Sequence, residues 1–388
     1  MKIKKIDILY FLALYLTLIR LLINSTTIME ISPFVQNVMQ VTIIVLLIIR
    51  CLYIKMTFKE VIIKFFIAIV FFISYRFSGE SAILLSYFLI IAAKDIDIDI
   101  IVKSILVPLA IFLFFCIFLY FLDSIFDIES LNLMTRTIDG ENVKRYTFFF
   151  KHPNCFAEYL CWTIFMILYI RFKKINITTW IYVIGIAAFL YVFPNSRTNC
   201  LILLMAIPIY YLYIKFNSKF IKFIQCNIYN ICLILSLIFI ILYGKNNLVN
   251  FVDKLLSSRI YCAYITNKVF GVSILGQKLP IGGNVVITQY EWIKKYALDN
   301  CYYRIIYSYG LCTTIIYTLF INKLIRFLVQ KKYKRELFFV TLLCIFNISE
   351  IVGVQAIIAF PLFFINEMFN DKEKEDKNGK SIYNNTGI

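Results

Sequence analysis

The sequence predicts an all-α polytopic integral membrane protein with about 12 transmembrane helices. The chain is 61% hydrophobic and only 16% charged, a balance that excludes an ordinary soluble domain. Apolar runs of roughly the length of a bilayer core recur along the chain, and in lipid they must be helical because their backbone groups find no water. Lys and Arg collect in every second gap between these runs, which predicts that both termini are cytoplasmic.

We expect spans at residues 6–23, 33–54, 61–75, 80–93, 101–122, 155–170, 177–193, 198–214, 224–243, 301–321, 337–350 and 354–369. The first lacks a small-residue cleavage pattern, so it is expected to be a retained span rather than a signal peptide. The third and fourth are short and flank Arg76 and Glu80, a pattern that also fits a re-entrant pair. The spans form one expected membrane domain, 1–370, and the charged tail 371–388 is expected to be disordered in the cytoplasm.

Two connections on the side opposite the termini are long. They are residues 123–154 and residues 244–300, the second between the ninth and tenth spans. A protein that only moves solutes needs no such elaborated surface, whereas loops carry function when a rigid scaffold positions them. The sequence therefore predicts that the chemistry lies at this outer side of the membrane.

The formal net charge of +17 does not indicate a nucleic-acid partner. Most basic residues lie at the ends of spans, where they contact the anionic lipid of the bilayer. The 11 cysteines show no CxxC or other ligand spacing, although Cys262 and Cys301 share one outer loop and can pair. Asp95-Ile-Asp-Ile-Asp99 matches the DxD pattern of nucleotide-sugar transferases, but we interpret it as an interfacial linker. We expect no metal and no cofactor.

His152 is the only histidine in the chain, and it lies directly before the sixth span. Its ordinary pKa of about 6.5 suits proton transfer near neutral pH. Pro153 fixes the backbone, and Asn154 can cap the helix that follows. An interfacial histidine beside a helix start is the alternative interpretation.

Arginine supplies a second set of candidate residues at the outer side: Arg145, Arg197, Arg259 and Arg304. Arg197 lies in a short turn with few other polar residues. Guanidinium groups bind phosphate oxygens through two parallel hydrogen bonds, so this set fits a lipid-linked diphosphate. Snorkelling arginines that contact lipid headgroups are the alternative. Glu350, in the connection between the last two spans, either pairs with an arginine of the set or faces water.

The segment Arg145–Asn154, with His-Pro-Asn at its end, resembles the motif of Wzy-type polysaccharide repeat-unit polymerases. Three further segments resemble that family: Ser196-Arg-Thr198, Ser258-Arg259 and Leu298-Asp-Asn-Cys-Tyr302. The plan of about a dozen spans with one large outer loop is also similar, and O-antigen ligases share it. One position departs from the pattern, because family members often have a glycine where this chain has Phe149.

The resemblance implies an inverting glycosyltransferase at the outer face of the bacterial cytoplasmic membrane. Its donor and acceptor are oligosaccharides linked to undecaprenyl diphosphate, in the synthesis of capsule, exopolysaccharide or O-antigen. Arg145, Arg197, Arg259 and Arg304 then bind diphosphate, and His152 or Asp299 is the base, with His152 otherwise positioning the acceptor. Asn154, Asn300 and Tyr302 contact sugar. A chain-length regulator and a flippase are candidate protein partners.

Other classes remain open at this level. A glycan ligase shares the same plan, and a flippase of lipid-linked oligosaccharides shares the apolar character, although it lacks a loop like 244–300. A secondary transporter or an acyltransferase is a further alternative. The set of glycans left in a deletion strain separates these classes.

Overall fold

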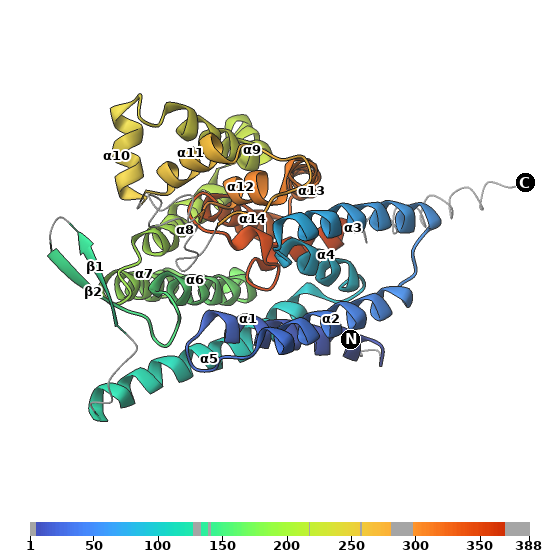
Figure 1. The fold of residues 1–388 in the computed structure, drawn as a ribbon, viewed down its shortest axis with the longest axis horizontal. Coiled ribbons are helices and arrows are strands. Elements are labelled where there is room, and N and C mark those ends of the chain that lie inside the picture. The colour runs from blue at the N-terminus through green and yellow to red at the C-terminus, as the bar shows by residue number, and fades with distance from the viewer. Residues whose placement is uncertain are drawn as a thin grey trace, which may run out of the picture. The chain divides into compact units, whose positions relative to one another are not determined.

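The computed structural model describes residues 5–126, 133–138, 141–216, 218–256, 258–280 and 298–368. Within these ranges, eight helices are long and apolar enough to cross a membrane (Figure 1). They are α1 (Asp7–Ser25), α2 (Pro33–Leu52), α3 (Phe58–Ser78), α5 (Ile98–Phe126), α6 (Pro153–Ile170), α8 (Arg197–Lys215), α9 (Lys219–Leu242) and α13 (Leu311–Gln330). Two apolar helices are shorter: α4 (Ala82–Ala92) and α7 (Ile177–Val192). The chain is a predominantly helical, multi-pass membrane protein.

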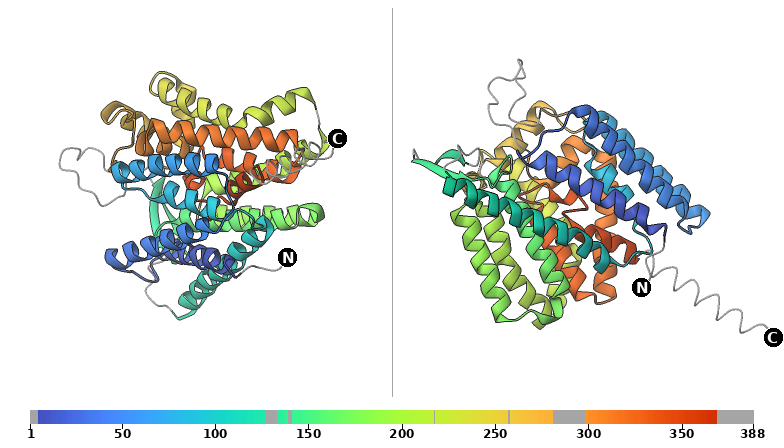
Figure 2. Two further views of the ribbon diagram at one scale, coloured as in Figure 1. Left: turned by 90° about the vertical axis from the view of Figure 1, so that its right-hand side faces the viewer. Right: turned by 90° about the horizontal axis from the view of Figure 1, so that it is seen from below.

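The structure divides into two compact units. The first unit comprises Met1–Ile54 and Ile91–Lys215, and the second comprises Lys55–Ile90 and Phe216–Ile388. In the first unit, α1 packs against α2 and α5, and α6 packs against α5 and α8. The green helices α6, α7 and α8 run side by side in Figure 2. Helix α6 is buried on most sides, with Trp162, Phe165 and Tyr169 in the core, as expected of a helix that is apolar all round.

In the second unit, α13 packs against α9, α3 and α14 (Lys334–Phe346). The predicted span 354–369 is wrong as a continuous helix. Residues 347–368 form turns, two 3-10 segments (Val352–Val354 and Phe360–Phe364) and one final helical turn. Nearly every residue from 352 to 368 is buried in the protein, so the segment is apolar because it fills a core. Hydropathy alone does not distinguish these two causes.

The predicted span 301–321 is also divided. A short helix, α12 (Cys301–Arg304), leads into a π-helical turn (Ile305–Tyr309), and α13 begins after Gly310 at φ 87°. The extended segment 271–280 crosses at this break, where Leu311 N–H donates to the carbonyl of Ser273. A side chain at Gly310 would collide with the backbone of Gly276, so only glycine permits this crossing.

Both long connections contain regular structure. Residues 123–154 include a two-stranded antiparallel ribbon, β1 (Leu133–Ile138) paired with β2 (Glu141–Tyr146), so the all-α prediction is wrong there. The Asp-Gly at 139–140, typical of two-residue hairpin turns, is the signal that could have found it. Residues 244–300 include α10 (Asn247–Leu255) and α11 (Arg259–Val269). The predicted disorder of 371–388 lies outside the described residues.

Candidate functional site

Backbone hydrogen bonds to two other segments of the first unit hold the residues before His152 in place. Lys151 N–H donates to the carbonyl of Ser25 at the end of α1, and Thr27 N–H donates to the carbonyl of Phe149. On the other side, Tyr146 N–H donates to the carbonyl of Phe193 in the connection between α7 and α8. The ribbon and the ends of α1 and α7 therefore position the His-Pro-Asn segment.

Phe148 and Phe149 have positive φ values of 50° and 63°, in the left-handed region. This conformation costs a side-chain-bearing residue about 1–2 kcal/mol, whereas glycine adopts it without penalty. Phe148 is held there by burial, with its ring stacked on Phe156 at 4.4 Å between centroids. Phe149 occupies the position at which the resembling family often has glycine.

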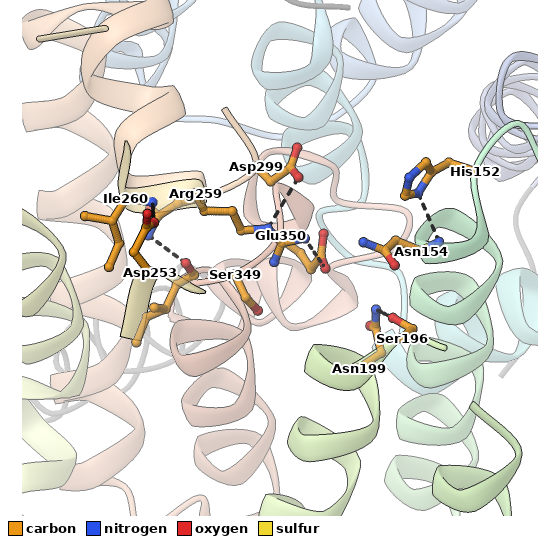
Figure 3. Close-up of polar contacts among 12 residues, drawn as sticks. His152, Asn154, Ser196, Asn199, Asp253, Arg259, Ile260, Asp299, Ser349 and Glu350 are labelled. Atoms are coloured by element: carbon orange, nitrogen blue, oxygen red, sulfur yellow. Dashed lines mark hydrogen bonds and ion pairs between the residues drawn. The ribbon is translucent and has the colours of Figure 1, made fainter. Parts of the chain in front are cut away.

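His152 caps the N-terminus of α6 with its ring. Its Nδ1 accepts a hydrogen bond from the backbone N–H of Asn154 at 3.1 Å (Figure 3). An accepting Nδ1 carries no proton, so the neutral ring carries its proton on Nε2. The residue thus presents an N–H donor on Nε2, and a role as base would require loss of the helix cap.

Arg145 joins the ribbon to the start of α6. Its buried guanidinium donates from Nε to the carbonyl of Pro194 at 2.9 Å and from Nη2 to Oδ1 of Asn154 at 2.6 Å. Three residues selected from the sequence, Arg145, His152 and Asn154, therefore form one cluster, which we call the histidine cluster. Because the Oδ1 of Asn154 accepts a hydrogen bond from Arg145, the hydrogen-bond donor of the Asn154 side chain is its amide nitrogen.

Arg197 begins α8 and is exposed, in contrast to Arg145. It forms no ion pair with any residue that the structure describes. The preceding Ser196 is buried, and its hydroxyl accepts a hydrogen bond from Asn199 at 2.9 Å (Figure 3). This bond fixes the first turn of α8, so Arg197 presents its charge from a rigid helix start. The group is suited to an anionic ligand.

In the second unit, Arg259 lies between two carboxylates in what we call the arginine cluster (Figure 3). Its Nη2 is 2.9 Å from Oε1 of Glu350, and its Nε is 3.4 Å from Oδ2 of Asp299. The side chains of Arg259 and Glu350 are each 6% exposed, whereas that of Asp299 is 34% exposed. Of the two alternatives for Glu350, the structure shows the pairing with an arginine. With two carboxylates on one guanidinium, Asp299 is the group of this cluster that can meet a ligand.

Asp253 of α10 fixes the position of Arg259, a role that the sequence did not reveal. Its Oδ1 accepts from the backbone N–H of Ile260 at 2.8 Å and of Tyr261 at 3.1 Å, in the first turn of α11. Burial raises the pKa of the Asp253 carboxyl, and these two N–H donors oppose that rise. Ser258 occupies the N-cap position without a side-chain cap, so a local capping rule would have named the wrong residue.

Asn300 and Tyr302, for which contact with sugar is predicted, form hydrogen bonds within the second unit. Both are buried. The Asn300 amide donates to the carbonyl of Ile348 at 2.7 Å, and its Oδ1 caps α12 at Tyr303. The Tyr302 hydroxyl donates to the carbonyl of Cys344 at 2.8 Å. These bonds hold α12 against α14 and the segment that follows it.

Arg304 is also paired within the second unit. Its Nε is 2.8 Å from Oε2 of Glu80, and the Ser308 hydroxyl donates to the other carboxylate oxygen at 2.5 Å. This pair anchors the π-helical turn to the connection between α3 and α4. Because Glu80 already neutralises its charge, Arg304 is a weaker anion ligand than Arg197.

The structure also describes the DxD pattern and the two cysteines that were expected to be able to pair. Asp97 of the DxD pattern accepts the backbone N–H of Asp99 at 2.8 Å, next to the start of α5. Cys262 and Cys301 are both thiols, so the suggested disulfide does not form. Among the described residues, no group of three or more His, Cys, Asp or Glu side chains is arranged to hold a metal ion.

Comparison of the chain with protein-family models, with curated proteins and with solved structures finds no match.

Proposed function

We propose that this protein polymerises oligosaccharide repeat units carried on undecaprenyl diphosphate, at the outer face of a bacterial cytoplasmic membrane. The observation that carries the proposal is the histidine cluster. Its three residues come from one segment that resembles the polymerase motif, and Phe149 in that segment has the backbone conformation that glycine prefers.

The reaction is a displacement at the anomeric carbon of the growing glycan. The hydroxyl oxygen of a single lipid-linked unit forms the new glycosidic bond, and the bond from the anomeric carbon to the diphosphate breaks. The hydroxyl proton passes to a base, and undecaprenyl diphosphate leaves with the electron pair. Direct displacement inverts the anomeric configuration, and the leaving group needs charge stabilisation more than protonation.

The first unit supplies the hydrogen-bond donors for that charge. We assign Arg197 and the Nε2–H of His152 to diphosphate oxygens, and the Asn154 amide to a sugar hydroxyl. Arg145 positions Asn154, since its own guanidinium is buried against it. Loss of one preorganised donor typically costs about 100- to 1000-fold in rate.

Two residues are candidates for the base, His152 and Asp299, and we favour Asp299. Asp299 is the partly exposed carboxylate of the arginine cluster, and Arg259 fixes its orientation. His152 is the weaker candidate because its Nδ1 is engaged at the helix cap and its Nε2 carries the proton. A positioned base contributes about 100- to 10,000-fold.

A deletion strain tests the class of function. Loss of a polymerase leaves single repeat units on the lipid and at the cell surface, so short glycans alone are expected. Long chains that remain unattached would indicate a ligase, and absence of exported units would indicate a flippase. Either result would overturn the proposal.

Complementation of that strain tests the residue assignments. Arg197→Ala and Asp299→Asn should give only short glycans at wild-type protein levels. Arg171→Ala is the matched control, because Arg171 is an exposed arginine at the opposite end of α6 from the histidine cluster. Full-length polymer from Arg197→Ala, or equal loss from Arg171→Ala, would remove Arg197 from the site.

A further inference from the structure

Helix α10 begins very close to the end of a candidate membrane span. Helix α9 ends at Leu242 and α10 begins at Asn247. The connection 243–246 spans at most about 14 Å when fully extended. The headgroup region on each side of a bilayer core is about 5–8 Å thick. Helix α10 therefore lies within reach of the membrane surface whatever path the connection takes.

The faces of α10 differ sharply in character. Val249 and Asp253, one turn apart, face inward and are buried. Leu248 and Phe251, also neighbours on the helix surface, are 69% and 59% exposed. Two large apolar side chains on one short helix form a surface that water disfavours.

Exposed lysines lie at both ends of this apolar face. Lys245 precedes α10, and Lys254 lies in its last turn. A short helix with apolar residues on one side and flanking lysines is typical of helices that lie in the plane of a membrane interface. The lysines complement anionic lipid, and continuity with α9 favours lipid over a separate protein partner.

We propose that α10 is an interfacial helix that binds the anionic lipid surface and positions Arg259 from there. Leu248 and Phe251 enter the boundary between headgroups and acyl chains, and Lys245 and Lys254 contact lipid phosphates. The inward face transmits this position, because Asp253 binds the first turn of α11 directly beside Arg259. This last step rests on the proposed function, since it gives the arginine cluster its role in the reaction.

Tryptophan quenching tests the lipid contact without any assay of activity. The full chain carrying Phe251→Trp is reconstituted in nanodiscs of phosphatidylcholine and phosphatidylglycerol, with and without bromine on the acyl chains. Wild-type protein supplies the background of the three native tryptophans. Asn267→Trp is the matched control, because Asn267 is an exposed polar residue on the neighbouring helix α11.

Brominated lipid should quench the added emission at position 251 at least twofold more than the added emission at position 267. Equal quenching at both positions, or quenching of position 251 by aqueous acrylamide instead, would overturn the proposal. Protection from both quenchers would mean that protein covers the face, and would overturn it as well.

Charge reversal tests the role of the lysines. Each lysine near an anionic surface changes the partition equilibrium about fivefold. Lys245→Glu with Lys254→Glu should therefore reduce quenching at position 251 in discs with phosphatidylglycerol and change little in pure phosphatidylcholine. Unchanged quenching in both discs would remove the lysines from the contact.

The two proposals fail in different ways. If α10 binds lipid but the protein is not a polymerase, the quenching results hold and the glycans of the deletion strain contradict the function. If the protein is a polymerase but α10 does not bind lipid, polymer length depends on Asp299 while position 251 is not quenched.

Discussion

Variants of the two carboxylates that flank Arg259 should differ in effect: removal of Glu350 should lower the stability of the protein, and removal of Asp299 should lower its activity. The Arg259–Glu350 pair is almost fully buried, with 2.9 Å between the charged atoms. Loss of one partner of a buried pair leaves an uncompensated charge and costs about 3–5 kcal/mol. The Arg259–Asp299 pair is longer, at 3.4 Å, and its carboxylate is 34% exposed, so its loss should cost about 0–1 kcal/mol.

We therefore expect Glu350→Ala to lower the melting temperature by several degrees and Asp299→Ala to leave it nearly unchanged. Activity should be lost in Asp299→Ala in spite of its normal stability. The measurement is thermal unfolding of purified protein in one detergent at one scan rate, since unfolding of such proteins is commonly irreversible.

A double variant completes the test. Replacement of both partners by apolar residues of similar size, Arg259→Met with Glu350→Leu, removes the unpaired charge and should recover most of the lost stability. If Glu350→Ala melts with the wild type while Asp299→Ala melts lower, the assignment of the two carboxylates is reversed.

Three further outcomes are expected. Because the backbone at Phe149 has φ 63°, Phe149→Gly should keep polymer length and raise the free energy of unfolding by up to about 1–2 kcal/mol, less the packing lost with the ring. Phe149→Val should lower the free energy of unfolding. Equal melting temperatures for the two variants would contradict this expectation. Because burial raises the pKa of Asp253, the unfolded chain loses this proton before the folded protein does, so stability should fall as pH rises from about 3.8 through the raised pKa. Asp253→Asn keeps the accepting oxygen and should flatten that part of the melting profile; an unchanged profile would exclude Asp253 as its source. His152→Asn should retain much of the helix cap but lose the Nε2–H donor, so stability near wild type with shortened glycans is expected, and full polymer length would remove His152 from the reaction.

Local features of the sequence were sufficient to predict most helices. Hydropathy and the spacing of basic residues located α1, α2, α5, α6 and α8 to within a few residues, because a bilayer permits only helices of about this length. The same reasoning failed for 301–321 and 354–369. Those apolar segments are interrupted by a backbone crossing at Gly310 and by burial within the protein, and neither leaves a signal in hydropathy.

For the candidate residues, the sequence predicted contacts between near neighbours in the chain but not contacts between distant segments. Residues close in sequence, such as Arg145, His152 and Asn154, were grouped correctly because a ribbon and a helix start bring neighbours together. Partners far apart in sequence were not foreseen, with Glu80 beside Arg304 the clearest case. The bonds of Asn300 at the cap of α12 and of Tyr302 to Cys344 were not foreseen either, and their contact with sugar stays a prediction.

The sequence by itself determined that the chain crosses a membrane several times and which polar residues are scarce enough to matter. Both follow from the cost of polar groups in hydrocarbon, which acts on composition and local order. Only the tertiary structure decided which of those polar groups are already satisfied. Hydrogen bonds and ion pairs between distant segments hold Arg304, Asn300 and Tyr302 within the protein, whereas Arg197 is exposed and Asp299 is partly exposed.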